Sequence, residues 1–233
     1  MTNTIECEFC GARLAPLLVE MGGRKVPLGY EFCHCEKAEE ARMARMAEDD
    51  AHAEKSRLAE VGRKLRKAGI PERYLDAKHE ATPSMADSIS SGRGYYIDGQ
   101  QGAGKSHLAM AVARECVLRN MSVKVVIVPD FIDSMRSRET EDRDATAKMA
   151  KCQLLVLDDL GKESPTAYAC ERLFSVINDR YNAMKPVIVT SNYTRGEIAR
   201  KLTEGDVGKS IASRLCEMTQ RIHLECEDRR LNG

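Results

Sequence analysis

Several features that would place a protein in a membrane or on nucleic acid are missing from this sequence. It contains no stretch of eighteen apolar residues, so no transmembrane helix is expected. Its first residues lack the basic-then-apolar order of an export signal. Lysine plus arginine and aspartate plus glutamate both count 36, which makes the net charge zero. Overall charge therefore gives no reason to expect nucleic-acid binding, which would need a local basic patch.

Length and composition allow one good-sized domain with a small appendage. The chain has 233 residues, of which 42% are hydrophobic, enough for a core. Nine cysteines without an export signal favour a reducing, cytoplasmic location and metal ligation over disulfides. Three parts are predicted: a cysteine-rich module over residues 1–35, a charged connecting helix over 36–68, and a βα-repeating domain over 69–233. A partner-docking or coiled-coil helix is the alternative for the middle part, with Met43 and Met46 at the contact.

A glycine-rich loop in the third part fits the pattern G-x-x-x-x-G-K-[ST]. It follows the β-prone segment Tyr95–Asp98 and precedes a helical pattern, which is the setting in which this pattern binds phosphate. Backbone N–H groups and the helix N-terminus would face the phosphate oxygens of a nucleoside triphosphate. Lys105 is expected to reach the β- and γ-phosphates, and the Ser106 hydroxyl to bind Mg²⁺. The predicted nucleotide-binding residues are Gly99, Gln100, Gln101, Gly102, Ala103, Gly104, Lys105, Ser106 and His107.

Polar side chains end two later predicted strands. The apolar run Leu154–Leu157 is followed by Asp158 and Asp159. Asp158 is expected to hold Mg²⁺, and Asp159 to orient or deprotonate the attacking water. Asn192 follows the run Val187–Thr190 and is predicted to donate a hydrogen bond to the γ-phosphate or the lytic water. An ordinary polar turn after a strand is the alternative at both places.

The cysteines of the first part have the spacing of a metal site. Cys7 and Cys10 form a Cys-x-x-Cys turn, and Cys33 and Cys35 flank His34. Four such ligands suit tetrahedral zinc, and a segment with so little apolar core would fold only around a metal. His34 could replace either neighbouring cysteine. Four unrelated reduced cysteines in a disordered tail are the alternative.

One arginine late in the chain has two interpretations. Arg214 lies in the amphipathic segment Ile211–Leu215, where it could pair with a surface carboxylate. It could also act as an arginine finger that neutralises transition-state charge at a neighbouring subunit's γ-phosphate.

The order of these motifs resembles the AAA+ replicative helicase loaders of the DnaC/DnaI type and the related transposition ATPase IstB. The resemblance covers roughly residues 69–226 and rests on Gly69–Tyr74, the phosphate loop, Leu157–Glu163, Leu173–Tyr181, Thr190–Asn192 and Ile211–Leu215. It implies a P-loop NTPase with a three-layer α/β parallel sheet. By this likeness the phosphate loop is Walker A, the two aspartates are Walker B, Asn192 is the first sensor and Arg214 is the trans finger.

The resemblance also implies an activity and partners. An ATPase is expected that uses Mg²⁺ and hydrolyses ATP slowly, since Asp159 stands where the family usually has glutamate. ATP and ADP would switch self-assembly and release. The first part would bind zinc and contact a hexameric replicative helicase, which the oligomer would deliver to single-stranded DNA, with Arg136, Arg138 and Lys148 as candidate DNA contacts. The alternatives are an IstB-like helper of a transposase, a zinc-dependent DNA-binding adaptor with a merely structural nucleotide site, and a small-molecule kinase.

One departure from the AAA+ pattern concerns the helical lid that often carries a second sensor arginine. The sequence ends soon after Arg221–Leu224, a predicted edge strand, so a clear lid is not expected. Arg229 and Arg230 lie close to the end of the sequence and are not expected to take that sensor role.

Overall fold

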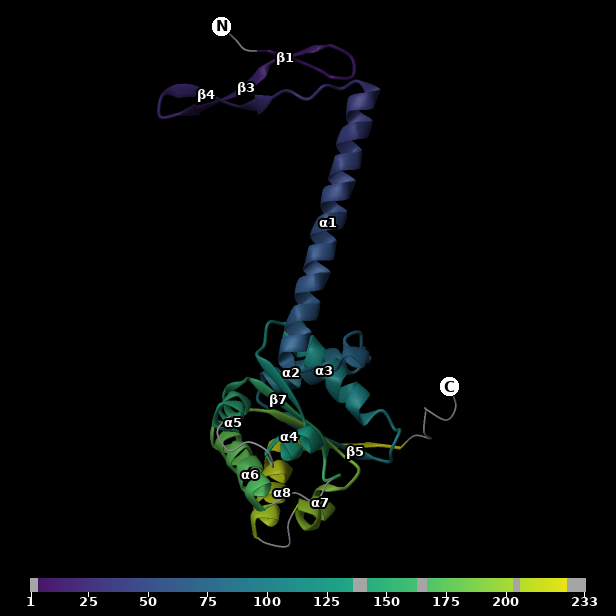
Figure 1. Cartoon of the computed structure of the whole chain (residues 1–233), viewed down its shortest axis with the longest axis vertical. Helices are drawn as coiled ribbons and strands as arrows, with labels where there is room; N and C mark the ends of the chain where they lie inside the picture. Colours follow the sequence, from purple (N-terminus) through teal and green to yellow (C-terminus); the bar gives the residue numbers. More distant parts are fainter. Residues whose placement is uncertain (1–3, 136–141, 163–166, 203–205, 226–233) are drawn as a thin grey trace. The chain divides into compact units, whose positions relative to one another are not determined.

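Short apolar runs that alternate with helices form one parallel sheet in the computed structural model (Figure 1). The structure describes residues 4–135, 142–162, 167–202 and 206–225, which fall into two units, 1–60 and 61–233. In the second unit the sheet has five strands in the order β6-β7-β8-β5-β9, and every neighbouring pair is parallel. The strands are β5 (Gly94–Gly99), β6 (Val123–Ile127), β7 (Leu154–Leu160), β8 (Val187–Ser191) and β9 (Thr219–Leu224).

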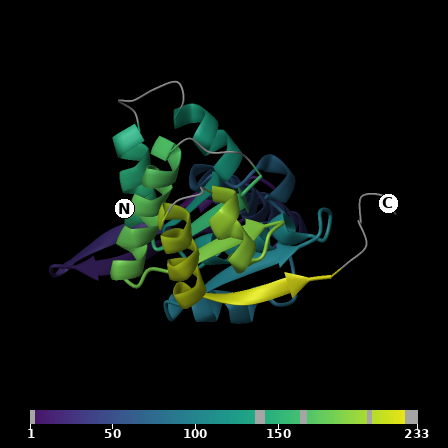
Figure 2. The ribbon, with the colours of Figure 1, turned by 90° about the horizontal axis from the view of Figure 1, so that it is seen from below.

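Helices cover both faces of this sheet (Figure 2). Side chains of a strand point alternately to the two faces, so Val156 packs in one core and its neighbour Leu155 in the other. The first core is covered by α2 (Thr82–Ser90) and α3 (Lys105–Leu118). The second is covered by α4 (Val128–Met135), α5 (Asp142–Lys151), α6 (Ala167–Asn182), α7 (Arg195–Leu202) and α8 (Asp206–Met218). The predicted three-layer fold is confirmed.

One predicted helix boundary is wrong. The sequence predicts a helix over residues 130–138 with Asp130 as its cap, but α4 begins at Val128 and Asp130 lies in its first turn. The helix follows β6 directly because Pro129 sits in the first turn, where its missing N–H removes no intrahelical hydrogen bond. The high charge of residues 138–144 also predicts a loop there. Residues 142–144 instead belong to α5, and residues 138–141 lie outside the described residues.

The first unit is built from hairpins and a helix. The strand β1 (Ile5–Glu6) pairs with β2 (Arg13–Leu14), and β3 (Pro16–Met21) pairs with β4 (Arg24–Tyr30), both antiparallel. Gly22 and Gly23 join β3 to β4 with φ angles of 61° and 75°, as a two-residue hairpin turn with a right-handed twist requires.

The helix α1 (Glu36–Ala68) occupies the range over which a charged helix is predicted. Its last turns belong to the second unit, where Leu65 and Ala68 are buried beside Ile70. That unit therefore starts before residue 69, the boundary predicted from composition. Within the described part of the chain, no helix is both long and apolar enough to cross a membrane.

Candidate functional site

A cavity of about 320 Å³ lies at the carboxyl ends of the strands β5, β7 and β8. The predicted phosphate-loop residues from Gln101 to His107 line it, together with Asp159 and Asn192. In open parallel sheets, ligands bind at this edge because loops from several strands converge there. The structure thus brings the phosphate loop, one Walker B aspartate and the predicted sensor to one cavity.

Glycine is required at two positions of the phosphate loop. Gly99 has a φ of 149°, and a Cβ there would collide with the carbonyl oxygen of Leu224 on β9. Gly104 has a φ of 89° and is the N-cap of α3, with no side-chain hydrogen bond to the cap. The first N–H groups of α3 are therefore not capped by a side chain at the point where this helix meets the cavity.

Lys105 is held against the loop that it follows. Its side chain is buried, and its Nζ donates hydrogen bonds to the carbonyl oxygens of Gly99 at 2.9 Å and Gln100 at 2.6 Å. Gly99 and Gln100, both predicted nucleotide-binding residues, thus support the lysine rather than line the cavity. This arrangement keeps the ammonium group at the cavity wall, where a phosphate would approach it.

Asp158 is buried behind the cavity and fixed by hydroxyl groups. Thr190 on β8 donates to its Oδ1 at 2.7 Å and accepts the Asp159 N–H at 2.9 Å. Burial raises the pKa of Asp158, and hydrogen bonds from Thr190 and Ser106 oppose that rise. The Asp158 carboxylate and the Ser106 hydroxyl are thus side by side, and a Walker-type Mg²⁺ site uses ligands of these two kinds. Thr190 was not predicted as a site residue, although it belongs to the predicted strand Val187–Thr190.

Asp159 sits at the cavity wall in a strained conformation. Its φ is 64°, which is uncommon for a residue other than glycine, and such outliers cluster at functional sites. Its Oδ2 lies 2.8 Å from Lys162 Nζ, and both residues line the cavity. The Walker B base predicted from the sequence therefore carries an ion pair that the sequence analysis missed.

Another part of the cavity is lined by residues that were not predicted as site residues. Tyr74 meets the His107 ring edge-on at 6.3 Å, and the Arg73 guanidinium stacks on Tyr74 at 4.5 Å. The signal was present, because both residues belong to the segment Gly69–Tyr74 on which the family resemblance rests. Aromatic and cationic groups of this kind suit the flat face of a nucleotide base.

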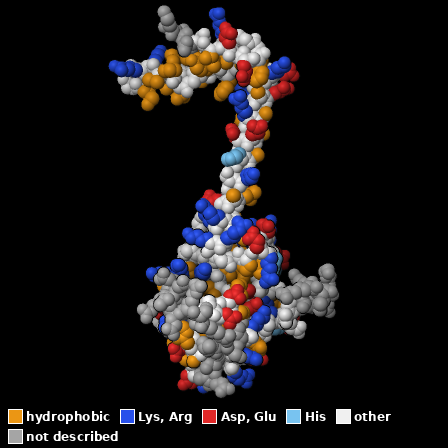
Figure 3. Space-filling model, in the orientation of Figure 1, with side chains coloured by type: hydrophobic (Ala, Val, Ile, Leu, Met, Phe, Trp, Pro, Cys, Tyr) orange, Lys and Arg blue, Asp and Glu red, His pale blue; other side chains and the backbone are white. Residues whose placement is uncertain are grey.

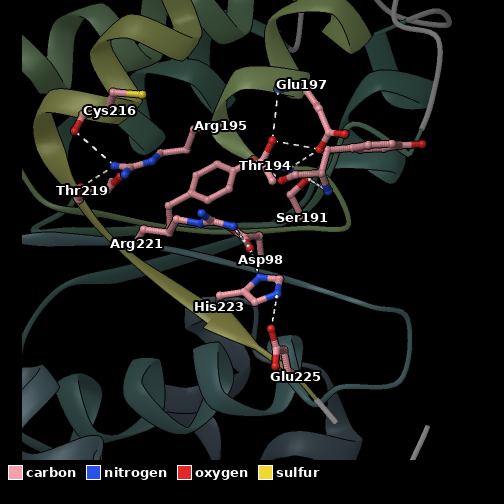
Figure 4. Close-up of polar contacts among 12 residues, drawn as sticks. Asp98, Ser191, Thr194, Arg195, Glu197, Cys216, Thr219, Arg221, His223 and Glu225 are labelled. Carbon is pink, nitrogen blue, oxygen red and sulfur yellow. Dashed lines mark hydrogen bonds and ion pairs between the residues drawn. The ribbon is translucent and has the colours of Figure 1, made fainter. Parts of the chain in front are cut away.

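A buried acidic side chain supports the phosphate loop from the sheet (Figure 4). Asp98 is 1% exposed and precedes Gly99; Arg221 of β9 binds it through Nε at 2.6 Å and Nη2 at 2.9 Å. His223 Nδ1 also contacts this carboxylate, and its Nε2 lies 3.5 Å from Glu225. The predicted edge strand over residues 221–224 is present as part of β9, and these contacts fasten it beside the loop.

Arg214 lies on α8 and is absent from the lining of the cavity of its own chain. Its guanidinium packs on the rings of Phe174 at 4.8 Å and Tyr181 at 5.7 Å, and its Nε donates to Asn178 Oδ1 at 3.1 Å. The predicted pairing with a surface carboxylate is not found in the described residues. Any action of Arg214 on a phosphate would therefore be on a neighbouring protomer's nucleotide.

The four predicted zinc ligands come together in the first unit. The sulfur atoms of Cys7, Cys10, Cys33 and Cys35 all lie within 4.8 Å of one another. Cys7 and Cys35 are 4.0 Å apart, and Cys10 and Cys33 are 3.4 Å apart. A tetrahedron of thiolates at zinc has edges of about 3.8 Å, so this donor set fits the ion. His34 lies outside the cluster and contacts Glu39 instead, at 3.3 Å.

Most of the predicted DNA-contacting and second-sensor residues cannot be placed. Arg136, Arg138, Arg229 and Arg230 lie outside the described residues, whereas Lys148 is exposed on α5.

The comparison with known proteins now identifies the family. A family model described as IstB-like ATP binding protein matches residues 72–233. The chain belongs to this family. The replicative helicase loader DnaI of Bacillus subtilis (strain 168) is 27% identical over 150 residues, which are 63% of this chain and 48% of the loader. The chain thus spans about half the length of that relative.

Two further matches extend the comparison. The phage-like element PBSX protein XkdC of Bacillus subtilis (strain 168) is 28% identical over 214 residues, 86% of this chain and 75% of XkdC. The crystal structure of a DnaI superposes with a TM-score of 0.58 at 24% identity, covering 66% of this chain and 94% of that one. This likeness shows the fold alone, a parallel sheet with helices on both of its faces.

Proposed function

We propose that this protein is an ATP-dependent helicase loader that acts in the cytoplasm. Its first unit would bind a hexameric replicative helicase, and its ATPase unit would assemble with other copies and deliver the helicase to single-stranded DNA. The observation that carries the proposal is the presence in one chain of a cavity lined by the phosphate loop and of a separate unit with a four-cysteine cluster and exposed apolar side chains. The similarity to a DnaI named as a replicative helicase loader supports it.

The residues of the cavity have complementary tasks in the proposed hydrolysis. The N-terminus of α3 and Lys105 would bind the phosphates, and Ser106 and Asp158 would hold Mg²⁺. Bound Mg²⁺ would neutralise charge on the phosphate oxygens. Asp159 would accept a proton from the attacking water, and Asn192 would orient it. Because Lys162 pairs with Asp159 and the aspartate is short, slow turnover is expected.

The place of Arg214 supports the proposed self-association. It is absent from the cavity lining of its own chain, so an arginine finger would have to come from a neighbour. In the proposed assembly, head-to-tail contact between identical protomers would bring one chain's Arg214 to the next chain's cavity. Binding of ATP would then favour the assembled state, and hydrolysis would favour release.

The first unit carries the surface proposed to bind the helicase. Of the thirteen large apolar side chains that are exposed in the described residues, eleven belong to residues 4–60. Figure 3 shows apolar side chains gathered along the β3–β4 hairpin. Leu28 and Phe32, with 75% and 68% of their surface exposed, are prominent examples. Exposed apolar groups at this density are typical of interaction sites.

The proposal is tested by affinity capture from the native host with the intact chain, followed by a loading assay. A replicative helicase should be recovered, and the purified pair should place that helicase on single-stranded circles in an ATP-dependent manner. Lys105→Ala is the matched control and should still capture the helicase but fail to load it. Capture of no helicase, or loading that ignores ATP, would contradict the proposal.

A second candidate function is a helper ATPase for a transposase. The family model that matches residues 72–233 is named after IstB, which favours this alternative. Recovery of a transposase and no helicase in the same capture experiment would replace the first proposal with the second.

A further inference from the structure

Arg214 is held by three side chains of one neighbouring helix. Phe174, Asn178 and Tyr181 lie one helical turn apart on α6 and so share a face. The two rings are 4.8 Å and 5.7 Å from the guanidinium, and the Asn178 amide oxygen accepts its Nε hydrogen at 3.1 Å. The backbone carbonyl of Ser210 accepts from Nη1 at 3.3 Å. Together these contacts fix the direction of a long side chain that would otherwise sample many rotamers.

We call Phe174, Asn178 and Tyr181 the cradle of Arg214. The cradle is itself bonded to α8, the helix that carries Arg214. The Tyr181 hydroxyl donates to Glu217 Oε2 at 2.5 Å, and Glu217 lies one turn beyond Arg214 on α8. The carboxylate that could have neutralised Arg214 therefore accepts a bond from Tyr181. Within the described residues Arg214 has contacts to π faces and to uncharged oxygens, but no ion pair.

This chemistry orients a positive charge without cancelling it. An aromatic face attracts a cation through its quadrupole, and an amide oxygen accepts a hydrogen bond while remaining neutral. An arginine that must stabilise negative charge on a phosphate needs both a fixed orientation and an uncancelled positive charge, because an ion pair within its own chain would compete with the phosphate.

We propose that Phe174 and Asn178 are positioning residues for a trans-acting Arg214, which they aim at the nucleotide of the neighbouring protomer. This inference rests on the proposed ATPase function and adds two residues to it. Loss of the cradle would lower the rate of hydrolysis at the neighbour's cavity and leave nucleotide affinity in the variant's own cavity unchanged.

The single variants test the cradle first. Asn178→Ala removes a hydrogen bond to a charged group and should lower kcat about tenfold with nucleotide affinity unchanged. Phe174→Leu should lower kcat roughly threefold, and Phe174→Tyr, which keeps an aromatic face, should lower it less. Asn182→Ala, an exposed site on the same helix, is the matched control and should behave as the unaltered chain. Unchanged nucleotide affinity also shows that each variant is folded.

Mixing of protomers distinguishes a trans role from simple packing of α6 on α8. Lys105→Ala protomers lack a working cavity but still carry an intact Arg214 and cradle. When they are mixed in equal amounts with Asn178→Ala protomers, they should supply a well-oriented Arg214 to the neighbouring cavities. Turnover should then rise about fivefold above the value expected from dilution, which is half the turnover of Asn178→Ala alone. Turnover equal to dilution, or a weakened nucleotide affinity in Asn178→Ala at full kcat, would overturn the cradle proposal.

The parallel mixture of Lys105→Ala with Arg214→Ala separates this inference from the function on which it rests. If that mixture recovers turnover and the Asn178→Ala mixture does not, Arg214 acts in trans without the cradle. If neither mixture recovers, the shared nucleotide site itself is wrong.

Discussion

The two units of this chain reach a folded state by different means. Of residues 4–60, Cys7 alone is buried, and large apolar side chains such as Leu28 are exposed. The second unit instead packs apolar side chains on both faces of a parallel sheet. Burial of apolar surface can stabilise only the second unit, so the first depends on its cysteine cluster. A substitution that destabilises one unit should therefore leave the stability of the other almost unchanged.

Removal of metal should cause the largest loss of stability, and this loss should be confined to the first unit. Structural zinc contributes about 10 kcal/mol or more to folding, far more than the few apolar contacts around Cys7 and Cys10 could replace. We expect close to one zinc per chain by elemental analysis. Cys7→Ser with Cys10→Ser should abolish zinc binding and melt the β1–β4 hairpins in NMR spectra.

The same double variant should bind nucleotide as tightly as the unaltered chain, with the same thermal midpoint for the second unit. Cys116→Ser is the matched control, because this thiol is buried in the second unit and lies outside the cysteine cluster. A purified protein without metal whose hairpins are intact would contradict the account.

Arg180 provides the next test, now on the second unit. This arginine is fully buried, and its guanidinium donates to the carbonyls of Met149, Cys152, Gln153 and Pro186 at 2.7–3.0 Å. Arg180→Met leaves these carbonyls without a donor and should lower the free energy of unfolding by at least about 3 kcal/mol in urea titrations. Arg172→Met on the same helix should cost less than about 1 kcal/mol. Equal losses of unfolding free energy in the two variants would mean that the buried hydrogen bonds of Arg180 do not stabilise the fold.

Substitution of Asp98 is expected to cause a smaller loss of stability, and the size of this loss depends on pH. Burial alone would raise the pKa of this carboxyl, but hydrogen bonds from Arg221 and His223 lower it below 3.8. The carboxylate thus stabilises the folded state above pH 3.8, and this stabilisation is lost as the pH falls through the lowered pKa. Asp98→Asn should cost about 1–2 kcal/mol near pH 7, since Arg221 is partly exposed to solvent.

Thermal unfolding across the acidic range measures this dependence. The difference between Asp98→Asn and the unaltered chain should shrink as the pH falls below 3.8. Asp87→Asn is a matched control, because its ion pair with Arg119 is exposed. A difference that stays constant with pH would show that the charge of Asp98 is not involved.

The smallest effect on stability is expected at the exposed apolar surface. Leu28→Ser should change the free energy of unfolding by less than about 0.5 kcal/mol, because the side chain is 75% exposed. Combined with Phe32→Ser it should weaken helicase binding at least about tenfold in titrations. Met184→Ser, at an exposed methionine of the second unit, should leave helicase binding unchanged. Equal binding by all these variants would remove the proposed surface.

Sequence patterns sufficed for the parts of the molecule whose conformation is set locally. The phosphate loop needs glycine where φ is positive, and the buried strands β7 and β8 begin as continuous apolar runs, Leu154–Leu157 and Val187–Val189. The position of Asp158 and Asn192 at the carboxyl ends of parallel strands then brings them together. The cysteine spacing likewise indicated the cluster of four thiols.

Other features depend on partners that are distant in the sequence. Asp98 meets Arg221 only because β9 pairs beside β5, and Arg214 meets Asn178 only through the packing of α8 on α6. No local pattern encodes such pairings. The β3–β4 hairpin was missed for a different reason, since its Gly22-Gly23 turn is a recognisable signal that the cysteine-based interpretation ignored.

A nucleotide bound between two identical protomers is the central feature of the proposed mechanism, and one measurement tests it directly. ATP turnover is compared for Lys105→Ala, Arg214→Ala and an equal mixture of the two. Each variant alone should be at least about a hundredfold slower than the unaltered chain. The mixture should recover about a quarter of full turnover, because one interface in four pairs an intact Lys105 with an intact Arg214. A mixture as inactive as its components, or full turnover by Arg214→Ala alone, would contradict the account.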